Sequence, residues 1–164
     1  MQKLRDEIVV DCNTFSDMVQ SYCTDRTGNS VDSEVFFLTL VADFMRYTAE
    51  QTPPGTRLKD IKMSAQATYE RAERKASRLH HCSTVKMSHA MHYANFEHEF
   101  MDNTLRAIKL AEAAVNSCQA ALHTIPPADN DSYNDAVHLQ ELLKENIAIW
   151  RGQDPRDVVA GLID

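Results

Sequence analysis

The sequence is poor in residues that interrupt helices. It contains only four glycines and five prolines among 164 residues. Because glycine and proline are the residues least compatible with a helix interior, this composition leaves room for long helices. No apolar run approaches the roughly 20 residues that a membrane span needs, and the N-terminus does not resemble a signal peptide. We therefore expect a cytoplasmic protein without a membrane partner.

Paired cysteines are also lacking. The four cysteines are widely scattered, and none belongs to a C-x-x-C motif. This pattern favours small core residues in a reducing compartment over disulfides or a zinc site. The cysteines are Cys12, Cys23, Cys82 and Cys118.

The chain has no overall excess of positive charge. Its net charge of −7 argues against nucleic-acid binding, which depends on cations that neutralise phosphates. The charge is uneven, however. Residues 57–86 carry eight basic and three acidic side chains, which leaves −12 on the rest of the chain. This asymmetry predicts a basic wall on an acidic molecule.

Sequence motifs of catalysis and cofactor binding are absent. The chain has no G-x-S-x-G, no phosphate-binding glycine loop and no Glu-x-x-His pair. In Glu97-His98-Glu99 the two carboxylates could shift the pKa of the histidine, but adjacent helical residues point in different directions. His80-His81-Cys82 with His89 and His92 suggests a metal site, although surface imidazoles explain these residues better. We predict no catalytic residue, no cofactor and no metal.

Apolar residues recur every three or four positions along most of the chain, which indicates amphipathic helices. No stretch shows the alternation of a strand, so we predict an all-α antiparallel array. Residues 1–150 would form one helical domain and residues 151–164 a tail. The expected helices span about residues 2–23, 35–50, 57–80, 84–100, 104–122 and 132–150.

The helix at residues 35–50 has two distinct faces. Its predicted core stripe is Phe37, Leu40, Val41 and Phe44. The other face carries Asp43, Arg46, Tyr47 and Glu50. An arginine fork beside a phenol suits a phosphate or a carboxylate. The alternative is that Arg46 pairs with Asp43 or Glu50 on a solvated surface, and spacing alone favours this alternative.

Two later helices could form a peptide groove. His92, Asn95 and Glu99 share one helical face near the middle of the chain, and Leu142, Asn146 and Ile149 share another near its end. Together with Arg46 and Tyr47 they would provide an anion receptor, amides and an apolar wall. Such a channel suits an extended phosphorylated peptide. Alternatively, Asn146 satisfies a buried backbone group.

Several segments resemble the 14-3-3 family. They include residues 35–50, ending in Asp43-Phe44-Met45-Arg46-Tyr47, and residues 133–150, ending in Leu142-Leu143-Lys144-Glu145-Asn146-Ile147-Ala148-Ile149-Trp150. Residues 67–72 and 111–122 also fit. The resemblance covers about residues 3–150, which correspond to the fourth to ninth helices of that fold. It implies that the chain is a divergent member of the family. It implies an adaptor that binds phosphoserine or phosphothreonine peptides and is not an enzyme.

The resemblance also implies roles for individual residues. Arg46 and Tyr47 match the pair that holds the ligand phosphate, and Asn146 matches an asparagine that binds the ligand backbone. The other matched groove positions are Glu99, Leu142, Ile149 and Trp150. Three residues depart from the family pattern. His92 stands in place of a second ligand-binding asparagine, Thr39 in place of a groove lysine, and His138 in place of an apolar residue.

The family's first three helices, with its dimer interface and two further basic phosphate ligands, have no counterpart in this sequence. Loss of two charged donors, at about 1.5–3 kcal/mol each, would weaken binding by roughly two to four decades. We therefore expect a degenerate or incomplete groove for phosphorylated client proteins, in a monomer or an atypical dimer with apolar surface exposed on its first two helices. The alternatives are a helical scaffold for unphosphorylated partners, or a fragment without binding activity.

Overall fold

The computed structural model describes residues 2–21, 28–126 and 128–152. These residues form six α-helices and one short 3-10 helix, and they contain no strand, which confirms the all-α prediction. The chain divides into two compact units, residues 1–79 and 80–164, and each is described by itself. The single domain at residues 1–150 stays a prediction, and most of the predicted tail lies outside the described residues. None of the helices described is long and apolar enough to cross a membrane.

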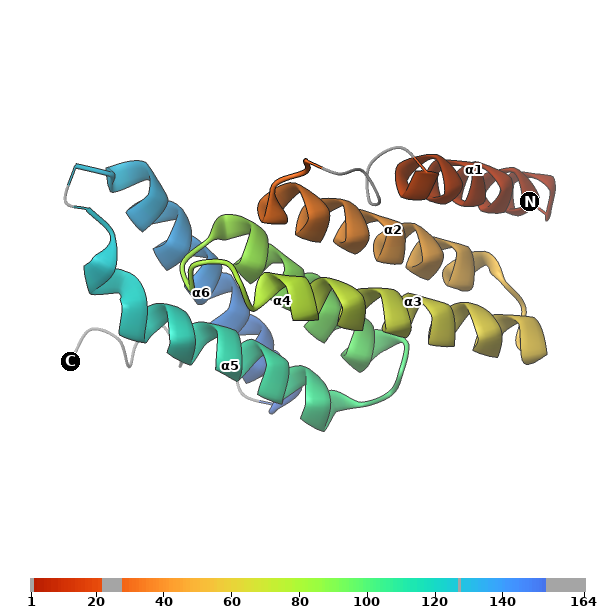
Figure 1. The fold of residues 1–164 in the computed structure, drawn as a ribbon. Coiled ribbons are helices and arrows are strands. Elements are labelled where there is room, and N and C mark those ends of the chain that lie inside the picture. Colours follow the sequence, from red (N-terminus) through yellow and green to blue (C-terminus); the bar gives the residue numbers. More distant parts are fainter. Residues whose placement is uncertain (1, 22–27, 127, 153–164) are drawn as a thin grey trace. The chain divides into compact units, whose positions relative to one another are not determined.

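The first unit contains three helices with the second in the middle (Figure 1). Helix α2 (Val31–Gln51) packs against α1 (Gln2–Val19) on one side and against α3 (Thr56–Ala76) on the other. The side of α3 that is buried consists largely of alanines, Ala65, Ala72 and Ala76, which lets a neighbouring helix approach closely. Pro53, Pro54 and Gly55 separate α2 from α3 as predicted, because proline cannot continue a helix.

The predicted core stripe of α2 is only partly right. Val41 is fully buried, but Phe37, Leu40 and Phe44 are half-buried. The buried face is instead Val35, Leu38, Val41, Ala42 and Ala49. The reason is that α2 packs against both α1 and α3, so its buried residues cover more of the helix surface than a single stripe does. Phe44 stacks on Phe15 of α1, with ring centroids 5.6 Å apart.

The start of α2 also differs from the prediction. The helix begins at Val31 rather than at residue 35, and it is capped by Ser30, whose hydroxyl accepts a hydrogen bond from the Ser33 backbone N–H at 3.2 Å. Ser30 satisfies an N–H group that has no partner within the helix. The predicted end of the first helix at Cys23, and the start of the following loop, lie outside the described residues.

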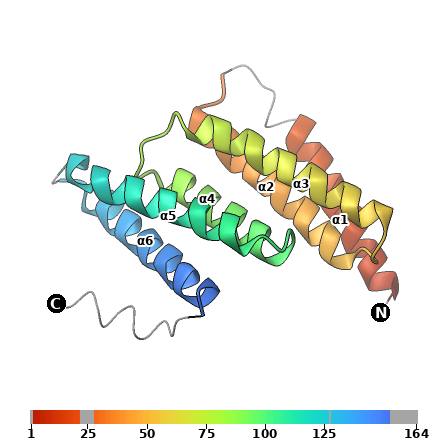
Figure 2. The ribbon, with the colours of Figure 1, turned by 90° about the horizontal axis from the view of Figure 1, so that it is seen from below.

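The second unit is a bundle of three long helices (Figure 2). It consists of α4 (Thr84–Glu99), α5 (Thr104–Ala121), the 3-10 helix η2 (Leu122–Thr124) and α6 (Asn130–Trp150). Ser83 and Asn103 cap α4 and α5, and their side chains accept from the backbone N–H groups of Lys86 and Arg106. Gly152 follows α6 with φ of 72°, the left-handed conformation that glycine adopts most easily.

The core of the second unit combines small residues with a few large ones. Its buried members include Met87, Val115, Cys118, Leu143 and Ile147. Leu105 is 64% exposed, because the buried stripe of α5 begins two positions later, at Ala107, on the other side of the helix. Cys12, Cys82 and Cys118 are buried free thiols, which confirms the prediction for the cysteines that are described. Burial beside Cys82 raises the pKa of Cys118 to about 12.

A buried carboxylate joins α4 to α5. Glu97 is fully buried, and its Oε1 lies 3.2 Å from Nε of Arg106. The same guanidinium donates from Nη2 to the Tyr93 hydroxyl at 2.5 Å. The adjacent residues diverge, as predicted: His98 contacts Thr104 of the next helix, with 3.0 Å between Nδ1 and Oγ1, whereas Glu99 is exposed.

We predict that Arg106→Met destabilises the protein by about 2 kcal/mol, because it removes a charged donor from the buried Glu97 carboxylate. The measurement is urea unfolding followed by circular dichroism. Lys109→Met, at an exposed position of the same helix, is the matched control and should change stability by less than about 0.5 kcal/mol. Equal effects of the two substitutions would contradict the structural role of Arg106.

Candidate functional site

Arg46 is the centre of a charged cluster in the first unit. Its Nη1 donates to Glu50 Oε1 at 3.0 Å, and its Nε lies 3.7 Å from Asp43 Oδ1. The Arg46 side chain is 17% exposed and the Asp43 side chain 8%. The guanidinium also lies over the Tyr47 ring, 4.4 Å from its centroid. Arg46 therefore makes both of the ion pairs considered as the alternative to a receptor, but it is far less exposed than a solvated surface pair.

Asp43 is itself held in place by a tyrosine of α3. The hydroxyl of Tyr69, a fully buried residue of α3, donates to Asp43 Oδ1 at 2.7 Å. Burial raises the pKa of Tyr69, and the Asp43 carboxylate raises it further, so the phenol stays protonated and remains a donor. Burial acts to lower the pKa of Arg46, but the neighbouring Tyr69, Asp43, Tyr47 and Glu50 outweigh it, and the pKa is raised. The guanidinium is therefore a permanent cation at a fixed position.

The predicted groove residues of the second unit lie on α4 and α6. A hydrogen bond from Asn146 Nδ2 to Asn95 Oδ1 at 3.2 Å joins these two helices. His92 and Leu142 are half-buried, whereas Glu99 and Ile149 are exposed, with Ile149 at 55%. Asn146 therefore contacts a side chain, and this contact differs from the predicted alternative of a buried backbone group.

Trp150 lies at the end of α6 and contacts α4. Its ring centroid is 5.2 Å from that of His98, and the two ring planes are tilted by 35°. His98 is itself held by Thr104. The indole is half-buried. This contact fixes the position of Trp150 within the second unit.

Two of the departures from the family pattern have a structural description. Thr39 is buried, and its hydroxyl donates to the Val35 carbonyl at 2.8 Å. Unlike the lysine that the family has here, it is uncharged and does not reach the surface. His138 is exposed on α6. Among the residues described, no group of three or more His, Cys, Asp and Glu side chains could hold a metal ion.

Sequence reasoning missed Tyr69 and the Asn95–Asn146 pair as features of the site. Tyr69 was seen only as part of a segment that resembles the family. A buried carboxylate requires a donor, but the burial of Asp43 beneath α3 is known only from the structure, so the sequence held no signal that pointed to Tyr69. Asn95 was placed on the right face of its helix, but its partner could not be identified without the crossing of α4 and α6.

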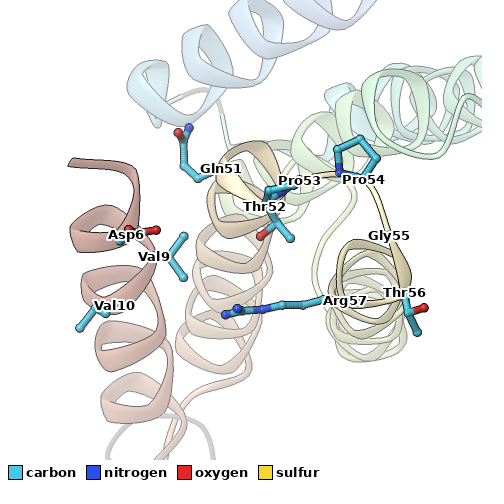
Figure 3. Close-up of a pocket in the computed structure, with 10 residues that line it drawn as sticks. All are labelled: Asp6, Val9, Val10, Gln51, Thr52, Pro53, Pro54, Gly55, Thr56 and Arg57. Atoms are coloured by element: carbon cyan, nitrogen blue, oxygen red, sulfur yellow. The ribbon is translucent and has the colours of Figure 1, made fainter. Parts of the chain in front are cut away.

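A cavity of about 460 Å³ lies elsewhere in the first unit, between α1 and the turn that joins α2 to α3 (Figure 3). Asp6 and Val9 line it from α1, and Thr52 lines it from the turn. Arg57 extends into it from the first turn of α3 (Figure 3). None of the predicted site residues lines this cavity.

The helices and their side chains define an all-α antiparallel protein with a fixed arginine in one unit and a polar α4–α6 face in the other. The family model described as 14-3-3 protein matches residues 1–151. The chain belongs to the 14-3-3 family.

Known relatives match most of this chain at low identity. The 14-3-3 protein homolog 1 of Schistosoma mansoni is 28% identical over 90% of this chain and 57% of its own length. The 14-3-3 protein homolog of Encephalitozoon cuniculi is 23% identical over 95% and 60%, and mouse 14-3-3 protein theta is 26% identical over 91% and 59%. The chain thus spans about three fifths of the length of these relatives.

We predict that Tyr69→Phe lowers the free energy of unfolding by about 2 kcal/mol near neutral pH, because it removes a buried hydrogen bond to a charged acceptor. Tyrosine in the unfolded chain loses its proton above about pH 10, whereas folded Tyr69 keeps it, so this stabilisation decreases as the pH rises beyond that value. The difference between wild type and variant should therefore shrink in alkaline urea titrations. Tyr133→Phe, at an exposed tyrosine, is the control, and a difference independent of pH would contradict the assignment.

Proposed function

We propose that this protein is a 14-3-3-like adaptor that binds phosphoserine- or phosphothreonine-containing segments of partner proteins and acts by binding rather than by catalysis. Arg46 and Tyr47 would contact the phosphate. Asn146, Leu142, Ile149 and Trp150 would line the path of the peptide, with His92 and Glu99 on the facing helix. The groove would be degenerate, since Thr39 supplies no cation and His92 replaces an amide.

The observation that carries this proposal is the environment of Arg46. A guanidinium held at two sides by carboxylates, and behind them by a buried phenol, is positioned before a ligand arrives. Preorganisation reduces the entropy that is lost on binding. Arginine is suited to phosphate because its planar fork matches two oxygens at once.

A second candidate function is a helical scaffold for unphosphorylated partners. One observation favours it: several large apolar side chains of the first unit are exposed, as was expected for its first two helices. Leu4 is 62% exposed, Phe15 51% and Phe36 53%. Exposed apolar groups of this size are typical of surfaces that meet another protein. Such a scaffold would make no use of Arg46.

Titration with a phosphoserine peptide pool and its unphosphorylated counterpart distinguishes the two functions. We expect the phosphorylated pool to bind more tightly, and Arg46→Ala to remove most of that difference, because a phosphate contact with a charged donor contributes about 1.5–3 kcal/mol, roughly one to two decades in Kd. Fluorescence anisotropy measures both affinities. Arg74→Ala, at an exposed arginine of α3, is the control, and Arg46→Lys tests the fork while keeping the charge. Equal affinity for the two pools would exclude phosphate recognition.

Glu50→Gln should strengthen phosphopeptide binding. Glu50 holds Arg46 Nη1 at 3.0 Å and would compete with the phosphate for it. An i,i+4 ion pair of a helix contributes only about 0.3–0.5 kcal/mol, and the Glu50 end of this pair is exposed, so we expect roughly a twofold gain. The affinity of the unphosphorylated pool should not change. A loss of phosphopeptide affinity would mean that Glu50 orients Arg46 for binding rather than competing with the ligand.

A further inference from the structure

Two carboxamides meet where α4 crosses α6. Asn146 Nδ2 donates to Asn95 Oδ1 at 3.2 Å, and both side chains are half-buried. Asn95 lies on the α4 face that also carries His92 and Glu99. Asn146 lies on the α6 face that carries Leu142 and Ile149. The amide pair is therefore at the centre of the predicted peptide path in the second unit.

This hydrogen bond uses only part of what the two amides offer. Each carboxamide has two N–H donors and an oxygen with two lone pairs. The bond occupies one donor of Asn146 and one lone pair of Asn95. Within the described part of the chain, neither side chain makes a further hydrogen bond. Asn95 therefore retains both N–H groups, and Asn146 retains its carbonyl oxygen.

A donor beside an acceptor can pair with the C=O and the N–H of one residue in an extended peptide. In an extended segment, the N–H and C=O of one residue point to the same side. The peptide carbonyl can accept from Asn95 Nδ2, and the peptide N–H can donate to Asn146 Oδ1. The mutual bond holds the two amides next to each other, so that one ligand residue would reach the remaining donor of Asn95 and the acceptor of Asn146. Recognition of this kind is independent of the ligand's side chains.

His92 cannot make the same pair of contacts. The two nitrogens of an imidazole lie on opposite edges of the ring, so one ligand residue can reach only one of them. Asn95 follows His92 by three residues, which is about 4.5 Å along the helix axis. Both residues lie on one face of α4, and only Asn95 is joined to Asn146.

We propose that Asn95 and Asn146 together bind the backbone of an extended ligand, and that Asn95 rather than His92 supplies the second backbone contact. This inference rests on the proposed peptide-binding function and deepens it. It places the contact closer to the C-terminal end of α4 than His92 would. It also makes Asn95 a ligand-binding residue for phosphorylated and unphosphorylated segments alike.

The test compares Asn95→Leu, Asn95→Asp and His92→Leu on the full chain with the two peptide pools described above. Asn95→Leu should weaken binding of both pools by the same factor, about 5- to 10-fold, which corresponds to one lost hydrogen bond. The ratio between the pools should not change, whereas Arg46→Ala changes that ratio. Asn116→Leu, at an exposed asparagine of α5, controls for the substitution, and circular dichroism confirms folding.

Asn95→Asp separates direct contact from positioning. The aspartate keeps an oxygen that can accept from Asn146 but lacks the ligand-facing N–H groups. On the unphosphorylated pool, where the added charge has least effect, a direct contact predicts the same loss as in Asn95→Leu. Retained affinity would overturn the direct contact, because Asn95 would then only position Asn146.

The other possible results of this experiment also test the inference. A loss in His92→Leu with none in Asn95→Leu would overturn the inference and return the second contact to His92. Equal binding of both pools would exclude phosphate recognition, yet the effect of Asn95 could still be measured on either pool. Absence of binding to both pools by the wild-type chain would overturn this inference together with the proposed function.

Discussion

The hydrogen bond from Tyr69 to Asp43 is the contact on which the first unit's candidate site depends. It joins α3 to α2 through a buried phenol and a buried carboxylate, 2.7 Å apart. Because Asp43 is fixed, Arg46 one turn later is fixed as well, and Glu50 holds the far side of the guanidinium. A long, flexible side chain is thereby kept in one place by a residue that never needs to touch a ligand.

The second unit uses a similar arrangement with different chemistry. Its buried Glu97 is held by Arg106, and that pair joins α4 to α5. On another face of α4, Asn95 bonds Asn146 and joins α4 to α6. In both units, polar contacts between helices fix the side chains that face outward. The apolar cores, rich in alanine, bring the helices close enough for these short contacts to form.

Much of this architecture could be predicted from the sequence, because helical periodicity and breakers such as Pro53 report local structure directly. The all-α class follows from such local features, and it was predicted correctly. The buried face of α2 was predicted only in part, because burial depends on how many neighbours a helix has and where they cross. Tyr69 and Asp43 are 26 positions apart, and no pattern within one helix could pair them. The roles of Arg46, Tyr47 and Asn146 in binding remain predictions.

In the proposed phosphate-binding role of Arg46, its ion pair with Glu50 would determine which acidic groups the arginine can bind. A carboxylate already occupies one side of the guanidinium at 3.0 Å. A ligand aspartate or glutamate brings the same group and the same single charge, so exchange offers little gain. A phosphate carries a charge of about −1.5 to −2 and three acceptor oxygens, so under this proposal it would displace the Glu50 carboxylate. Acidic substitutions that imitate phosphorylation in a partner would then be poor substitutes for the phosphate itself.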